Sequence, residues 1–199
     1  LLHRTAEGFQ PVASGTAATL RALWLGPGGE LWAAGTQGTL LHGDSRAVKP
    51  ASLPQPVDVN AVFGFAANDV WFAGAQGLVA RWDGAAVRPV ASGSKAALYG
   101  IFGAAPGELW AVGDNGTILR GDRSGLRPTP VKTGETLHAI AGSGPRDIWA
   151  VGSGGVILHY GGSGWAKVIS GTTMALYGLA EHPRGDLWAV GQWGTALRY

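Results

Sequence analysis

The chain is a succession of short apolar runs, each bounded by turns rich in glycine. Examples are residues 98–103 (LYGIFG) and 109–112 (LWAV), which contain Leu, Ile, Val and aromatic residues. Runs of this length between turn residues are typical of β-strands, and no segment keeps the 3.6-residue period of an amphipathic helix. The sequence therefore predicts an all-β protein.

The runs repeat with a period of 39 residues. Their most regular feature is a tryptophan that recurs at Trp32, Trp71, Trp110, Trp149 and Trp188. Each tryptophan follows an acidic residue by two positions and precedes glycines by three and six positions, as Glu108, Gly113 and Gly116 show in the third repeat. Self-similarity at a fixed period near 40 residues indicates a repeat architecture.

Four strands are predicted in each repeat. In the third repeat they are 98–103, 109–112, 117–120 and a strand centred on Leu126, which Pro128 follows. Because proline cannot donate to a strand ladder, the fourth strand is expected at the edge of its sheet. Four-stranded sheets repeated at this spacing are typical of β-propeller blades. We expect residues 1–199 to form a single domain, a five-bladed β-propeller of four-stranded antiparallel blades.

The chain begins and ends within a repeat, since residues 1–4 (LLHR) share the phase of residues 196–199 (ALRY). We therefore expect residues 7–12 to supply the fourth strand of the last blade and to close the ring, which would remove open strand edges. The duplicated third-strand segment leaves open the alternative that the chain is a piece of a larger propeller.

The segment 113–116 (GDNG) is predicted to be the turn between strands two and three, with Gly116 at a positive φ. A phosphate loop would need a lysine and a following helix, and a calcium loop would repeat its carboxylates in the other turns. The acid before each tryptophan is expected to accept backbone N–H groups of a tight turn. The basic residue ten positions after the tryptophan, Arg120 in this repeat, is expected to pack on it or to pair with the acid.

Composition narrows the functional classes. Charged residues make up only 14% of the chain and the formal net charge is +2, which does not indicate a nucleic-acid partner. The chain has no cysteine, so it offers no disulfide, thiolate nucleophile or thiolate metal site. No apolar run approaches the 18 residues of a membrane span, and we expect no membrane insertion. We expect no metal and no cofactor.

The repeat Asp-(Ile/Leu/Val)-Trp-x-Val-Gly-x-x-Gly-x-Ile-Leu-(Arg/His)-Tyr resembles short bacterial β-propeller repeats, of the kind in photosystem II assembly-factor-like and BNR-like (sialidase-like) proteins. The resemblance covers all five copies, and it implies a rigid platform for binding or assembly. The sialidase Asp-box is absent, so sialidase chemistry is not implied. A monomer in the periplasm or outside a bacterial cell is our expectation.

One position stands apart from the repeated framework, the second residue of strand one. It is polar or aromatic in every repeat, yet it varies: Arg21, Asn60, Tyr99, His138 and Tyr177. Since strand one lines a propeller's channel, these side chains could form a ring at its mouth that binds a polar ligand. The alternative is that they are only the half-exposed first residues of a strand. Trp193, in a turn that elsewhere holds Gln, Asn or Gly, is a further candidate.

Three functional classes compete. A non-catalytic module that binds a protein partner is favoured, because the variable positions differ from blade to blade. A lectin that binds a glycan is the alternative, although it would be expected to repeat its site in each blade. A glycoside-active enzyme would need paired carboxylates near the channel. The only loop acids expected on that face are Asp58, Asp114 and Glu135, so we predict no catalytic residues.

Overall fold

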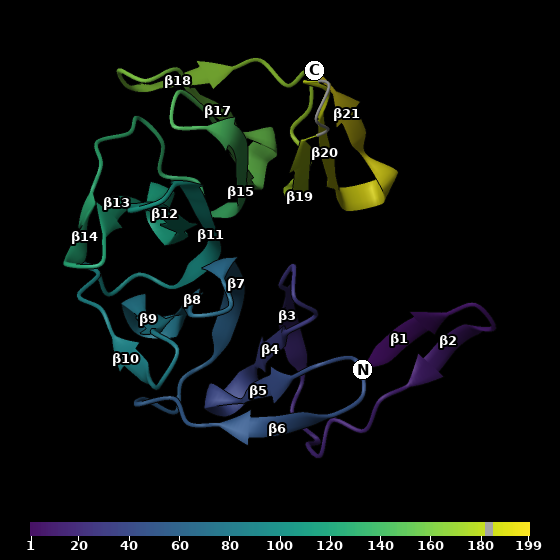
Figure 1. The fold of residues 1–199 in the computed structure, drawn as a ribbon. Helices are drawn as coiled ribbons and strands as arrows, with labels where there is room; N and C mark the ends of the chain where they lie inside the picture. Colours follow the sequence, from purple (N-terminus) through teal and green to yellow (C-terminus); the bar gives the residue numbers. More distant parts are fainter. Residues whose placement is uncertain (182–184) are drawn as a thin grey trace.

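The computed structural model covers residues 1–199 and describes all of them except 182–184. The described part consists of antiparallel strands joined by turns. Four sheets have four strands, one has three and one is a two-stranded hairpin. Figure 1 shows the larger sheets following one another around a common centre in an open arc, with strand one of each sheet innermost. The structure confirms the all-β prediction.

Consecutive strands are neighbours in every sheet. The first sheet contains β3 (Leu20–Leu25), β4 (Leu31–Gly35), β5 (Leu40–Gly43) and β6 (Val48–Ala51). The second contains β7 (Val59–Ala66), β8 (Asp69–Gly74), β9 (Val79–Trp82) and β10 (Val87–Pro89). The third contains β11 (Leu98–Ala105), β12 (Glu108–Gly113), β13 (Ile118–Asp122) and β14 (Gly125–Pro128). The fourth contains β15 (Leu137–Gly144), β16 (Asp147–Gly152), β17 (Ile157–Tyr160) and β18 (Trp165–Val168). Four strands per repeat are therefore confirmed for these four repeats.

The ends of the chain differ from the prediction. The fifth sheet has only β19 (Leu176–Glu181), β20 (Leu187–Gly191) and β21 (Ala196–Arg198). The strand expected to complete it, β2 (Gly8–Pro11), pairs instead with β1 (Leu2–Thr5). The hairpin lies beside the first sheet and apart from β21 (Figure 1). Closure of the last blade by the N-terminal strand is wrong in this structure, because β1 takes the third-strand place next to β2 that β21 was expected to fill.

The hydrophobic core lies between successive sheets. Between the second and third sheets, Trp71 and Ala73 of β8 pack with Leu98 and Ile101 of β11 and with Leu109 of β12. The other three cores repeat this arrangement between neighbouring sheets. Each of the first four of these sheets therefore buries the tryptophan face of strand two against the next sheet, which is why the pattern of apolar residues recurs from repeat to repeat.

In the first four repeats, the two glycines allow the turn between strands two and three to approach the backbone of neighbouring loops closely. These turns are the single-turn helices η1 (Thr36–Gly38), η2 (Ala75–Gly77), η3 (Asp114–Gly116), η4 (Ser153–Gly155) and η5 (Gln192–Gly194). A Cβ at Gly113 would lie 2.0 Å from the carbonyl oxygen of Ala97. Gly116 has φ +67°, as predicted, and a Cβ there would lie 2.1 Å from the carbonyl oxygen of Thr133. The preceding residue, Asn115, also has a positive φ of 54°.

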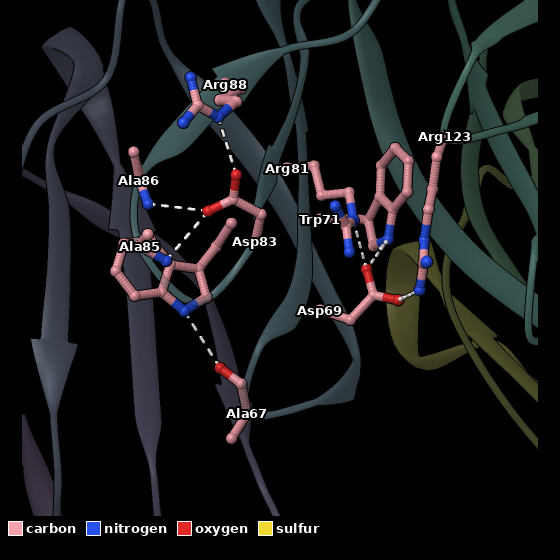
Figure 2. Close-up of polar contacts among 10 residues, drawn as sticks. Ala67, Asp69, Trp71, Arg81, Asp83, Ala85, Ala86, Arg88 and Arg123 are labelled. Carbon is pink, nitrogen blue, oxygen red and sulfur yellow. Dashed lines mark hydrogen bonds and ion pairs between the residues drawn. The ribbon is translucent and has the colours of Figure 1, made fainter.

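The acid before the tryptophan binds side chains of strands two and three. Asp69 accepts hydrogen bonds from Trp71 Nε1 at 2.9 Å and from Arg81 Nε at 2.6 Å. Arg123, from the third sheet, donates to the other oxygen of Asp69 at 2.7 Å (Figure 2). The predicted pairing of acid and basic residue is confirmed, and Glu108 with Arg120 repeats it at 2.9 Å. The expected role of the acid in binding turn backbone is wrong for Asp69, because these three donors take its oxygens.

Candidate functional site

The five variable residues lie on five neighbouring strands at the inner edge of the arc. We call them the channel row: Arg21, Asn60, Tyr99, His138 and Tyr177. Each sits at an irregularity of strand one. Leu98 pairs with Gly113 and Gly100 pairs with Val112, so Tyr99 is an extra residue opposite consecutive partners. The same shift brackets the other four row residues. A β-bulge re-aims a side chain and leaves it outside the regular ladder.

Polar contacts connect the first part of the channel row. Arg21 Nη1 lies 2.8 Å from Asn60 Oδ1 and 2.9 Å from Asp58 Oδ2. Asn60 Nδ2 in turn donates to the carbonyl oxygen of Leu98, on strand one of the next sheet, at 2.9 Å. The loop acid Asp58 also accepts the backbone N–H of Gln37 at 2.9 Å. Because each contact crosses from one sheet to the next, the side chains are fixed relative to one another.

Aromatic contacts connect the second part. The ring centroids of Tyr99 and His138 are 5.9 Å apart, and those of His138 and Tyr177 are 5.0 Å apart. His138 Nε2 lies 3.0 Å from Ser153 Oγ in the turn of its own sheet. Tyr177, at the end of the row, is exposed. The row therefore changes from a charged and amide surface at one end to an aromatic surface at the other.

Burial disfavours the charged forms of His138 and Tyr99. Burial lowers the pKa of His138, and the charge of Asp114 opposes this shift only in part. Burial, together with Asp114, raises the pKa of Tyr99. Asp114 accepts the Tyr99 hydroxyl at 3.4 Å and the Thr136 hydroxyl at 3.2 Å. A neutral imidazole between two phenol rings can stack on a ligand and exchange hydrogen bonds with it, but it does not attract a ligand by its charge.

Trp193 lies in turn η5, between β20 and β21, and 91% of it is exposed. Its φ is 53°, a left-handed conformation that is uncommon for a bulky residue. Gln37, Gln76 and Asn115 occupy this turn position in other repeats with similar φ values. The structure thus places Trp193 on the surface, and its described contacts do not join it to the channel row.

Three polar residues near the row were not proposed as site residues from the sequence: Asp58, Asp114 and Ser153. The two acids were recognised only as loop residues expected on this face. A signal was nevertheless present, because Asp114 and Ser153 are the first turn residues of their repeats, and each turn packs against the start of strand one.

The described residues contain no group of three or more His, Asp or Glu side chains placed to hold a metal ion. Among the same residues, no helix is long and apolar enough to cross a membrane.

Comparison with known proteins supports the fold. No protein-family model matches the chain, and no curated protein matches it. A solved structure described as YCF48 bound to D1 peptide is 19% identical with a TM-score of 0.71, over 92% of this chain and 65% of that one. The WD40 β-propeller domain of Doa1 is 12% identical with a TM-score of 0.78, over 98% of this chain and 66% of that one. The fold is therefore that of a β-propeller, and the chain spans about two thirds of the length of these two structures.

Proposed function

We propose that this chain is a non-catalytic binding module that holds a segment of a protein partner across the channel row. The observation that carries the proposal is that strand one of each of the five larger sheets has a β-bulge at the position that is polar or aromatic in every repeat yet differs between repeats. A bulge supplies the same outward geometry in every sheet, while the side chain differs from sheet to sheet. The result is a surface with five different chemical groups in fixed order.

A single asymmetric ligand suits this surface better than a repeated small one. A lectin with one sugar site per blade would need similar groups at each position, whereas Arg21, Asn60 and Tyr99 have little in common. A peptide backbone has donors and acceptors along its length, and its side chains differ, so it can match a row whose groups differ. Among proteins of similar fold, the one named as bound to D1 peptide holds such a ligand, which supports the proposal.

Trp193 gives the proposed surface a second contact point. A bulky residue at positive φ is strained by an amount on the order of 1 kcal/mol or more, and an exposed ring gains no core packing in return. Backbone strain that brings no packing is found at functional sites more than elsewhere. Exposed tryptophans are also enriched among the residues that dominate protein interfaces. We propose that Trp193 packs against the partner beyond the end of the channel row.

The test is a peptide-display selection on the immobilised chain, run beside a glycan array. Both are repeated with the double variant Tyr99→Ala/Tyr177→Ala. A matched control, Phe9→Ala/Ile169→Ala, removes two exposed apolar side chains outside the row. We expect the row variant, still folded by circular dichroism, to bind the selected peptides about tenfold more weakly or worse, since truncation of an interface aromatic commonly costs more than 1 kcal/mol.

Undiminished binding by the row variant would place the site elsewhere on the molecule. Selected glycans without selected peptides would replace the proposal with the lectin alternative. A loss of binding in both double variants would show that the selection had recognised exposed apolar surface rather than the channel row.

A further inference from the structure

The last sheet exposes residues that every other sheet buries. Trp188 is 46% exposed, whereas the four equivalent tryptophans, such as Trp110, are at most 5% exposed. Val190 is 49% exposed, although Val112 and Val151 at the same position are completely buried. Strand two has a similar sequence in each repeat, so the difference in exposure comes from the element that covers the strand. The covering element in the other sheets is strand one of the next sheet.

The turn of the last sheet has lost the same neighbour. A Cβ on Gly116 would lie 2.1 Å from Thr133, and one on Gly155 would lie 2.1 Å from Thr172, both in the loop that leads into the following sheet. A Cβ on the equivalent Gly194 would have nothing within 4 Å, although its φ of +73° is the same. The glycine thus keeps a conformation adapted to a loop that this structure does not place beside it.

The first sheet is exposed on its opposite face. Leu23 and Leu25 of β3 are 58% and 63% exposed, whereas Ile101, which is equivalent to Leu23, is 7% exposed. The hairpin β1–β2 covers only the outer part of this face, and a cavity of about 510 Å³ between them is lined by Leu2, Phe9, Leu23 and Leu25 among others. By the phase of the repeat, β1 and β2 correspond to strands three and four of a preceding blade. The cavity lies next to them, where strands one and two of that blade would pack.

The two faces are complementary halves of the interface that the chain already forms four times. The face of Trp188 and Val190 matches the one that Trp71 and Ala73 present, and the face of Leu23 matches the one that Ile101 presents. We propose that both are docking surfaces for further β-blades of this repeat type, which fill the opening of the arc. The proposal stands on these contacts and not on the function proposed above.

Blades fit the opening better than a second copy of this chain. The five larger sheets curve around one centre and leave an opening between β19 and β3 (Figure 1). The two propellers of similar fold extend beyond the matched region by about a third of their length, which is the content of two or three blades at this repeat length. A second copy would bring five sheets to that opening. Its contact would be head-to-tail, and such contacts build open chains unless the rotation closes.

Single cysteines can measure the accessibility of each face, because the chain has none of its own. Val190→Cys reports on the last sheet and Leu23→Cys on the first. Val151→Cys, at the buried position equivalent to Val190, sets the reaction rate of a covered site. Each variant is prepared in the 199-residue chain and in a chain extended after Tyr199 by two further copies of residues 122–160, which continue the repeat in phase. The readout is the rate of reaction with a maleimide reagent.

We expect the cysteines at positions 190 and 23 to react quickly in the 199-residue chain. In the chain extended by two copies they should react at least about tenfold more slowly, approaching the rate at position 151. A chain extended by one copy should protect position 190 but leave position 23 reactive. Unchanged reactivity at position 190 in both extended chains would overturn the proposal, and so would failure of both to fold cooperatively. Protection in the 199-residue chain that grows with concentration, with a dimer mass in sedimentation, would replace the blades with a second copy.

Discussion

Replacement of Trp110 and Trp188 by alanine compares one side chain in two surroundings. Both tryptophans lie on strand two of their repeats, and Arg120 and Arg198 lie over their rings at 4.9 and 6.0 Å. Trp110 is completely buried and donates Nε1–H to Glu108 at 3.0 Å, whereas Trp188 is 46% exposed. A tryptophan buries roughly 150–250 Å², and at about 25 cal/mol per Å² this corresponds to about 4–6 kcal/mol.

Large-to-small core changes at tryptophan cost about 3–5 kcal/mol in practice, and we expect Trp110→Ala to fall in this range. Trp188→Ala removes about half of the buried area, so we expect a loss of about 2 kcal/mol. Trp193→Ala, in an exposed turn, should cost less than about 1 kcal/mol. Urea unfolding followed by far-UV circular dichroism measures all three free energies. Equal losses for Trp110→Ala and Trp188→Ala would refute the reasoning, because they would show that the last sheet is covered in solution.

Three more predictions concern the repeated framework and the channel row. Asp69→Ala should destabilise the protein by about 3–5 kcal/mol, because it leaves the partly buried Arg81 without its partner. Asp186→Ala, whose partner Arg198 is exposed, should cost under about 1 kcal/mol. Equal urea midpoints for the two variants would contradict this. Gly116→Ala should lose at least about 2 kcal/mol, from left-handed strain and the contact with Thr133, whereas Gly194→Ala should lose about 1 kcal/mol from strain alone; thermal unfolding distinguishes them, and identical shifts would argue against the contact. Burial lowers the pKa of His138, so the folded state disfavours its protonated form. Acidification from pH 7.5 to 5.5, through the ordinary histidine pKa near 6.5, should therefore lower the melting temperature more in the wild type than in His138→Gln. An equal drop in the two proteins would show that His138 does not contribute.

Most of the architecture could be predicted because it follows from local rules that recur. A tryptophan with an acid two residues before it and glycines three and six after it specifies a strand, a turn and a packing face, and five copies make the signal unambiguous. The position of the channel row was predictable for the same reason, since comparison of the repeats with one another identifies the position of strand one that is polar or aromatic in every repeat yet differs between them.

The bulge and the open arc could not be predicted in this way. A bulge depends on pairing between two strands, and nothing in the residues around Tyr99 distinguishes an extra residue from a regular one. Closure depends on the rotation between successive sheets, which accumulates over the four interfaces and which no single residue determines. The phase of residues 1–4 showed that β2 is a fourth strand, but the phase does not specify the sheet that the strand completes.

The bulge also explains how the chain can keep one framework and vary one surface. Tyr99 is bracketed by Leu98, which is completely buried, and by Gly100, where a Cβ would lie 3.0 Å from Val112 Cγ2. The flanking residues therefore fix the backbone, and the bulged side chain is not part of the buried core clusters between the sheets. A row residue can change without loss of core packing, whereas a change at Trp110 or Gly113 alters an interface between sheets. Each blade of this repeat type added to the arc would bring one more residue at the bulge position, so filling the opening would also extend the channel row.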